Sequence, residues 1–418
     1  MKIVSGMRPT GKLHLGHYLG VIKNWLKLQK ENECYFFIAD WHALTNKYKN
    51  TQELKENIKQ MIIDWLACGI NPKKATLFIQ SGVKQHAELS LLFSMITPKS
   101  WLELNPSYKD LKFNLMYQYL KDFLLGKQIK INQAPPPESY DEALEKATGK
   151  QKNKIFEEYL REAFHRTFYS KKGLDLDYLK EVLIKFGIQK KIVEEAISNL
   201  KDGDVGKDID TVGFLSYPVL QAADILIYKA QGVPVGEDQL PHIELTREIA
   251  RRFNNLYKEI FPEPEAILTE EAKLLGIDGR KMSKSYNNAI YLSDNEEEVN
   301  QKVLQMKTDP QRIKKTDPGN PDVCIVYDYH KIFTSDKNTL EEIDTKCRNA
   351  EIGCVECKKI LANSLNQFLT PIREKRKEIE QNIGKYEKVF IDGTLKCREI
   401  AEETMKEVRD VMSLYGNF

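Results

Sequence analysis

Short apolar runs alternate with longer amphipathic stretches over residues 1–96, and this alternation predicts the fold class. Each apolar run is followed by a stretch that has the spacing of a helix. Strands and helices that alternate in this way are typical of an α/β fold, a parallel sheet with helices on both faces. The apolar runs are Ile3–Val4, Cys34–Ala39 and Ala75–Ile79, and the stretches that follow them span about 17–30, 52–68 and 84–96.

The same alternation returns later in the chain. Pro218–Tyr228 is apolar and amphipathic, Val233–Val235 has the pattern of a short strand, and about 239–253 has helical spacing. We therefore expect residues 1–112 and 208–293 to form the two halves of one sheet domain.

Two other segments have a different pattern. Residues 113–207 contain few β-branched clusters, many Lys and Glu, and apolar positions at helical spacing, so we predict a helical insertion. Long helical patterns dominate 294–418, which predicts a separate all-helical C-terminal domain.

Composition and charge exclude several classes of protein. The chain has 418 residues, of which 41% are hydrophobic and 30% charged, and this balance does not fit disordered or collagen-like proteins. The net charge is only +2, so contact with a nucleic acid would need a local basic patch. No run of about 18 uncharged apolar residues and no signal-peptide pattern is present, which predicts a cytoplasmic protein without a membrane span.

The turn after the first predicted strand contains the sequence His14-Leu15-Gly16-His17. It falls where a helix begins, so backbone N–H groups and the helix dipole can meet a phosphate there. His14 and His17 are three residues apart and are expected on the same side, while Gly16 allows a flat group to approach the backbone. The alternative is an ordinary helix start with two solvated histidines, and zinc fits this spacing less well.

A second basic motif, Arg280-Lys281-Met282-Ser283-Lys284, follows Gly276 and Gly279. Transfer of a phosphoryl or nucleotidyl group needs neutralisation of developing negative charge, which two lysines can supply. As a charge run alone, the motif would be more typical of a solvated loop.

Asp224 lies on an otherwise apolar stretch, in the first turns of a predicted helix. A buried carboxylate needs a hydrogen-bond donor, and either a ligand or a structural N–H would serve. His42, next to Trp41, is likewise either a structural histidine or part of a pocket.

Taken together, the two basic motifs resemble the His-x-Gly-His and Lys-Met-Ser-Lys-Ser signatures of class I aminoacyl-tRNA synthetases. Between them, Tyr217–Leu226, Val233–Gln239 and His242–Arg247 are most similar to the bacterial tryptophanyl-tRNA synthetases, with the tyrosyl enzymes as near relatives. The resemblance spans about 1–112 and 208–418. It implies a Rossmann-like sheet around an ATP site and a helical domain for the tRNA anticodon.

The resemblance also implies a tryptophan–tRNA ligase that uses ATP with Mg²⁺, binds tRNA(Trp), and is usually a homodimer. By position, the catalytic residues would be His14, His17, Lys281, Ser283 and Lys284. The ATP site would comprise Arg8, Thr10, Gly16, His17, Gly236, Asp238, Lys281, Met282, Ser283 and Lys284. The tryptophan site would comprise His42, Tyr217, Gln221, Asp224, Val233, Val235 and Gln239, with Asp224 accepting the indole N–H.

Three departures separate the chain from the commonest bacterial pattern. Arg8 stands where many relatives have Gln, and Gln221 stands where many have Met. The segment 113–207 is far longer than the matching connection in typical relatives.

Four of the seven cysteines have the spacing C-x₂₂-C-x₆-C-x₂-C, at Cys324, Cys347, Cys354 and Cys357. Four thiolates suffice for a zinc site or a [4Fe–4S] cluster, and four unrelated thiols are a third possibility. The spacing is similar to that of an iron–sulfur cluster in a subset of thermophilic tryptophanyl-tRNA synthetases, and this resemblance favours [4Fe–4S].

Three other functions stay open on the sequence alone. They are a tyrosyl-tRNA synthetase, a nucleotidyltransferase acting on a small metabolite, and a non-catalytic iron–sulfur regulator. The regulator would leave both phosphate-binding motifs without a use.

Overall fold

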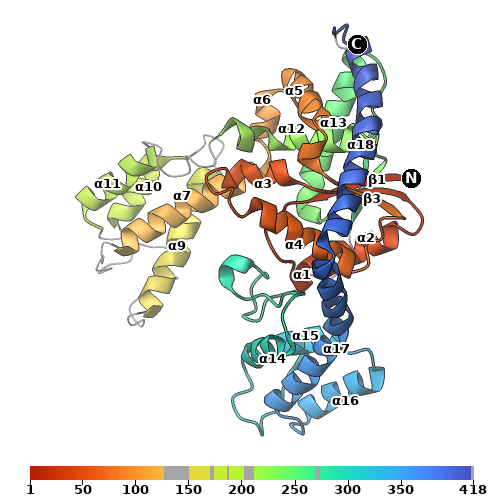
Figure 1. The fold of residues 1–418 in the computed structure, drawn as a ribbon. Helices are drawn as coiled ribbons and strands as arrows, with labels where there is room; N and C mark the ends of the chain where they lie inside the picture. The colour runs from red at the N-terminus through yellow and green to blue at the C-terminus, as the bar shows by residue number, and fades with distance from the viewer. Residues whose placement is uncertain (127–149, 170–173, 186–187, 202–210, 269–273, 416–418) are drawn as a thin grey trace. The chain divides into compact units, whose positions relative to one another are not determined.

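The chain folds into two compact units in the computed structural model (Figure 1). Met1–Thr97 and Pro218–Phe418 form the first unit, and Pro98–Tyr217 forms the second. The structure describes residues 1–126, 150–169, 174–185, 188–201, 211–268 and 274–415. Residues 127–149, 170–173, 186–187 and 202–207 of the predicted insertion, and 208–210 after it, therefore lie outside the described residues.

A parallel sheet of five strands, in the order β3-β2-β1-β4-β5, lies at the centre of the first unit. The pairing of each strand with its neighbours is parallel, as the sequence predicts. The strands are β1 (Lys2–Met7), β2 (Glu33–Ile38), β3 (Ala75–Ile79), β4 (Gly232–Val235) and β5 (Glu265–Leu268). Strand order reverses beside β1, and sheets of this kind bind ligands outside the carboxyl ends of the strands at such a point.

Helices cover both faces of the sheet. Successive side chains of β2 point to opposite faces, so they contact different helices. On one face, Phe36 stacks on Trp25 of α2 (Lys23–Leu28), with ring centroids 4.3 Å apart. On the other face, Tyr35 stacks at 5.3 Å on Tyr228, which follows α12 (Val212–Leu226). The predicted α/β class is therefore confirmed.

Three local predictions differ from the structure. The stretch 17–30, expected as one helix, is divided into α1 (Leu15–His17), the π-helical turn η1 (Tyr18–Ile22) and α2. A further helix, α3 (Asp40–Lys47), follows β2 directly. Asp224 lies in the last turn of α12 and not in the first turns, because α12 begins before Pro218 and continues through it.

The remaining predicted helices of the sheet region begin and end close to their expected positions. They are α4 (Leu54–Ala67), α5 (Gln85–Ile96) and α13 (Leu240–Leu256), with the short turns η2 (Gln80–Gly82) and η3 (Glu237–Gln239) after β3 and β4. The apolar side of α4 joins one hydrophobic core with the sheet and with C-terminal residues such as Leu361 and Phe390. Helices α5 and α13 pack on each other, with the rings of Phe93 and Phe253 5.9 Å apart.

The second unit is helical and has a core of its own. Its helices include α6 (Lys99–Glu103), α7 (Pro106–Gly126), α9 (Lys150–Phe168), α10 (Leu176–Lys185) and α11 (Lys190–Lys201). Leu120, Phe156, Phe164 and Leu183 are among its fully buried side chains. These helices agree with the helical pattern of the sequence there.

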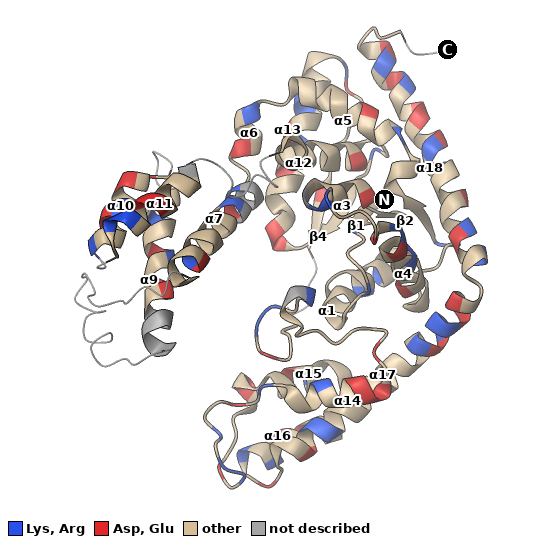
Figure 2. Cartoon of the chain, turned by 60° about the vertical axis from the view of Figure 1, so that its left-hand side comes forward, with Lys and Arg blue, Asp and Glu red and all other residues tan. Residues whose placement is uncertain are grey.

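The C-terminal region is helical and belongs to the first compact unit, together with the sheet. Its helices are α14 (Glu296–Gln305), α15 (Ile325–Phe333), α16 (Lys337–Arg348), α17 (Cys354–Gln381) and α18 (Ile383–Val411). Side chains of both charges alternate along α18 (Figure 2), in keeping with the near-zero net charge.

Helix α18 lies against the edge strand β3. The Ile79 N–H donates to Thr394 Oγ1 at 3.1 Å, which satisfies a backbone group at the sheet edge. The approach is close at Gly393, where an added Cβ would lie 2.0 Å from the carbonyl oxygen of Leu77.

Within the described residues, no helix combines the length and the apolar character that crossing a bilayer requires.

We predict that Gly393→Ala destabilises the fold, because the new methyl group meets backbone and not a movable side chain. Overpacking of this kind typically costs about 1–3 kcal/mol. The measurement is thermal unfolding followed by circular dichroism. Gly384→Ala is the matched control in the same helix, since an added Cβ there has no neighbour within 4 Å. Equal melting temperatures for the two variants would contradict the close packing of α18 on β3.

Candidate active site

The His14-Leu15-Gly16-His17 segment begins α1 just beyond the carboxyl end of β1. The rings of His14 and His17 stack with centroids 3.7 Å apart, and the His14 N–H donates to His17 Nδ1 at 3.2 Å. An added Cβ at Gly16 would lie 3.0 Å from His14 Nδ1, so glycine is required for this ring to lie over the backbone. His14 Nδ1 is buried and has no hydrogen-bond partner among the described residues.

Both histidines are neutral at physiological pH. Burial, with the charge of Lys284, lowers the pKa of His14 to about 4. Burial, with His14 and Lys284, lowers the pKa of His17 to about 3. Since His17 Nδ1 accepts a hydrogen bond, its proton resides on Nε2, which can donate to a phosphate oxygen.

The second motif, Lys281-Met282-Ser283-Lys284, lies in a loop fastened by the buried Asn288. The Ser283 N–H donates to Asn288 Oδ1 at 2.8 Å, and Asn288 Nδ2 donates to Asp278 Oδ1 at 2.8 Å and to the Lys281 carbonyl at 3.2 Å. The side chain of Met282 is buried, whereas Lys281 is exposed. Asn288 and Asp278 thus shape the loop, and sequence reasoning did not single them out.

The two motifs meet in space. Lys284 Nζ donates to the Thr10 carbonyl at 2.7 Å, across 274 residues of sequence. Burial and the charge of Lys47 lower the pKa of Lys284 to about 8. A partly buried ammonium group therefore lies on the turn that carries the two histidines.

Backbone hydrogen bonds hold the chain segments next to these motifs together. The Leu15 N–H donates to the Ile290 carbonyl at 3.0 Å, and the Leu292 N–H donates to the Leu13 carbonyl at 3.0 Å. His14 and Tyr291 form an antiparallel bridge between them. The Leu13 N–H also donates to Asp64 Oδ2 at 2.7 Å, and Asp64 forms a buried ion pair with Arg376 of α17.

Asp224 of α12 lies in a cluster of buried polar side chains. Its exposed fraction is 1%, and its carboxylate accepts hydrogen bonds from His42, Gln80 and His86. Burial opposes ionisation, but the charge and hydrogen bond of His42, with those of His86, hold the pKa of Asp224 below its usual value. His42 was expected here from the sequence, whereas Gln80 and His86 were not.

The other predicted site residues lie around β4 and its neighbours. Val233 and Val235 are buried in β4, and Gly236 follows them. An added Cβ at Gly236 would lie 2.8 Å from Asp238 Oδ1, and Gln239 Nε2 donates to Asp238 Oδ2 at 3.2 Å. Arg8 is exposed, and Gln221 and Thr10 are half-buried. Tyr217 belongs to the second unit, where its ring lies 5.5 Å from that of Phe214.

The four clustered cysteines come from α16, α17 and the start of α15. Arg312 Nη1 lies 3.7 Å from Cys347 Sγ and 3.9 Å from Cys354 Sγ. Burial and the neighbouring thiols of the other three raise the pKa of Cys357 to about 12. Among the residues that the structure describes, no three His, Cys, Asp or Glu side chains converge as ligands of a metal ion. The predicted metal site is therefore not confirmed.

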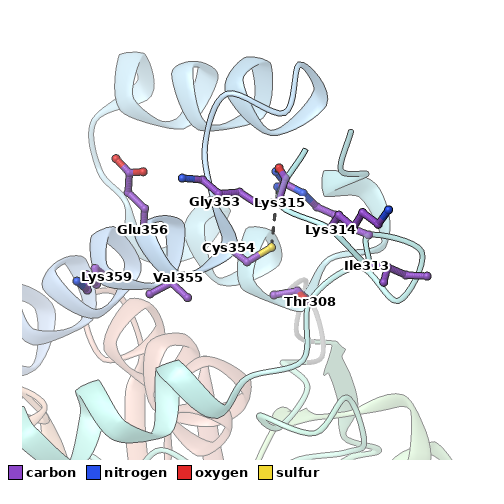
Figure 3. Close-up of a pocket in the computed structure, with 10 residues that line it drawn as sticks. Thr308, Ile313, Lys314, Lys315, Gly353, Cys354, Val355, Glu356 and Lys359 are labelled. Atoms are coloured by element: carbon purple, nitrogen blue, oxygen red, sulfur yellow. Dashed lines mark hydrogen bonds between the residues drawn. The ribbon is translucent and has the colours of Figure 1, made fainter. Parts of the chain in front are cut away.

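A basic cavity of about 620 Å³ opens beside these cysteines at the start of α17 (Figure 3). Cys354 lines it, and its charged side chains are Arg312, Lys314, Lys315, Lys359 and Glu356. Four cations against one carboxylate make this surface suited to an anion.

Comparison with known proteins identifies the family. The family model of class I tRNA synthetases (W and Y) matches residues 1–127 and 185–370, which leaves 128–184 and 371–418 unmatched. A tryptophan–tRNA ligase of Aquifex aeolicus is 55% identical over 419 residues, covering 99% of this chain and 100% of the relative, and one of Thermotoga maritima is 44% identical, covering 99% of each.

Solved structures agree with this result. A tryptophanyl-tRNA synthetase from Campylobacter jejuni, crystallised with ADP and tryptophan, has a TM-score of 0.70 and 27% identity, covering 99% of this chain and 100% of that one. The family match covers more than half of the chain, on a fold that brings both signature motifs together. The chain therefore belongs to the class I tRNA synthetases of the tryptophan and tyrosine group.

Proposed function

We infer that this chain joins tryptophan to its tRNA in a reaction driven by ATP. The observation that carries this conclusion is the meeting of the His14–His17 turn with the Lys281–Lys284 loop, in a chain with full-length identity to tryptophan–tRNA ligases. The tyrosyl enzyme, the small-metabolite nucleotidyltransferase and the iron–sulfur regulator are disfavoured because these relatives are tryptophan–tRNA ligases.

We propose that ATP lies between the two motifs. His14 and His17 would donate hydrogen bonds to its phosphates, and Lys281 and Lys284 would neutralise them from the opposite side. The adenine would lie near Gly16, and Gly236 and Asp238 would contact the ribose. Support for this arrangement comes from His17, whose Nδ1 accepts a hydrogen bond so that its proton lies on Nε2, and from the position of the Lys284 ammonium group on the Thr10 turn.

In the activation step, the tryptophan carboxylate attacks the α-phosphorus of ATP. An oxygen–phosphorus bond forms to give the adenylate, and the bond to pyrophosphate breaks, so that pyrophosphate departs with the electron pair. Lys281 and Lys284 stabilise this departing charge. Mg²⁺, when bound to the phosphates, adds further neutralisation. No side-chain nucleophile is required.

In the transfer step, the 2′-hydroxyl of the terminal tRNA ribose attacks the adenylate carbonyl. An ester bond forms to the tRNA, and AMP departs. We place the tRNA anticodon on the helical C-terminal region, whose basic cavity at Lys314, Lys315 and Lys359 suits phosphate oxygens. The homodimer expected from the resemblance stays a prediction.

We propose that tryptophan binds at the carboxyl end of β4 and beside α12. Val233, Val235 and Gln221 would surround the indole ring, and Asp224 would accept its N–H with His42 at the border of the pocket. Tyr217 and Gln239 would hold the amino group. The burial and hydrogen bonding of Asp224 support this role, because a fixed acceptor strongly rejects side chains that lack a donor.

We also propose that Cys324, Cys347, Cys354 and Cys357 hold a [4Fe–4S] cluster. The four-cysteine spacing supports this proposal, as does the guanidinium group of Arg312, which lies against the sulfurs of Cys347 and Cys354 and would offset the charge of an anionic cluster. Zinc stays the alternative. The cluster would act in structure or tRNA contact, because the reaction transfers no electrons.

The first prediction from this proposed function concerns Lys284. Lys284→Ala is expected to reduce kcat for ATP–pyrophosphate exchange about 100-fold or more, with little change in tryptophan affinity, because its contact strengthens as charge develops. Lys30→Ala, at an exposed lysine after α2, is the control and should keep wild-type exchange. Unchanged turnover of Lys284→Ala would refute its role.

The second prediction is a pH dependence. The charged form of Lys284 is the one that neutralises phosphate, so kcat/KM for ATP in exchange should fall as pH rises through about 8. In Lys284→Arg, the guanidinium stays charged and this decline should move to higher pH. An identical alkaline decline in both proteins would assign the titration to another group.

The third prediction concerns the cysteines. Protein purified without oxygen should be brown, with iron and sulfide bound, and Cys354→Ser should lose the visible absorption. Cys68→Ser removes a thiol outside the cluster and should retain it. A colourless protein with one zinc ion per chain would overturn the cluster.

A further inference from the structure

The carboxylate of Asp224 is held by three side chains from different elements. His86 Nδ1 of α5 lies 2.6 Å from Oδ1, and His42 Nε2 of α3 lies 2.7 Å from Oδ2. Gln80 Nε2 of η2 donates to both oxygens, at 2.8 and 3.0 Å. A carboxylate has about four lone-pair sites, so these donors nearly saturate it and fix its plane.

The three donors differ in their exposure. His86 and Gln80 are 0% exposed, whereas His42 is 9% exposed. A ligand therefore reaches Asp224 from the side of His42, while His86 and Gln80 hold the carboxylate from within the protein. His86 touches no position that a ligand can occupy, so any effect on the ligand acts through Asp224.

A second buried contact determines which ring nitrogen of His86 carries the proton. His86 Nε2 lies 2.7 Å from the hydroxyl of Tyr228, which is itself buried. In the neutral ring, Nε2 accepts the Tyr228 proton, and Nδ1 must then carry the proton that it donates to Asp224.

We propose that His86 is a positioning residue that sets selectivity for an indole N–H. In the tautomer selected by Tyr228, it keeps Asp224 ionised and oriented, so that the carboxylate stays an acceptor toward the ligand side. This inference rests on the proposed role of Asp224 in binding tryptophan.

The physical reason is the cost of an ionised carboxylate in a buried site. Without the His86 donor, one oxygen loses a short hydrogen bond, and the carboxylate either rotates or takes up a proton. In either state it is a poorer acceptor for the indole N–H. A substrate whose side chain has the same shape but no N–H makes no hydrogen bond to Asp224. Its binding is therefore not weakened by the change at His86.

The test compares tryptophan with its analogue in which sulfur replaces the indole N–H, 3-benzothienyl-alanine, in ATP–pyrophosphate exchange by the full chain. His86→Leu should lower kcat/KM for tryptophan about 10- to 100-fold and change that of the analogue much less, so the preference falls. His86→Asn should recover most of the preference, since its amide nitrogen can take the place of Nδ1. Tyr228→Phe should give a smaller loss of preference.

The outcomes separate this inference from the proposed function. If His86 has a purely structural role, His86→Leu lowers kcat/KM for tryptophan and for the analogue equally. An unchanged preference in this variant would therefore overturn the inference. If His86→Leu does not fold, Tyr228→Phe provides the test. An unchanged preference for tryptophan in Tyr228→Phe would also overturn the inference. Asp224→Asn is the reference variant: if it keeps the preference, Asp224 is not the acceptor and the proposed function of this residue fails. If it loses the preference while the His86 and Tyr228 variants keep it, only the positioning role fails.

Discussion

The active site depends on the pairing of two chain segments that are remote in sequence. Leu13–Leu15 exchange backbone hydrogen bonds with Ile290–Leu292, and this short ladder holds the histidine turn beside the lysine loop. Because backbone groups make the pairing, its geometry does not depend on long flexible side chains. The Lys284 ammonium group can then donate a hydrogen bond to the Thr10 carbonyl. Separately, each motif is an ordinary turn or an ordinary basic loop, and together they form the proposed triphosphate site.

The same turn is joined to the C-terminal helices by one buried carboxylate. Asp64 of α4 accepts the Leu13 N–H and pairs with Arg376 of α17. Helix α17 carries Cys354 and Cys357 in its first turn, next to the basic cavity. Loss of either partner of such a buried ion pair destabilises the fold, because the remaining charge is left uncompensated. The histidine turn and the helix that borders the cavity therefore share one interaction at the interface between α4 and α17.

The sequence predicts the repeating architecture well and the exact contacts poorly. The alternation of apolar runs predicts β1 to β4, because a strand buried on both faces needs a continuous apolar run. Strand β5 has no fully buried side chain, and helix α12 passes through Pro218, so pattern alone places neither correctly. The two motifs were recognisable because their residues are contiguous. Gln80 and His86 were not, because their importance arises from a contact with Asp224 far along the chain. Their position directly after β3, at the carboxyl edge of a parallel sheet, is the signal that could have indicated them.

The central claim is that two imidazoles and two ammonium groups bind one triphosphate. A crystal structure of this protein with tryptophan and a non-hydrolysable ATP analogue tests it most directly. The account predicts triphosphate oxygens within hydrogen-bond distance of both His14 or His17 and Lys281 or Lys284, with the α-phosphate facing the tryptophan carboxylate. A triphosphate bound away from either motif, with Lys284 still on the Thr10 carbonyl, would contradict it.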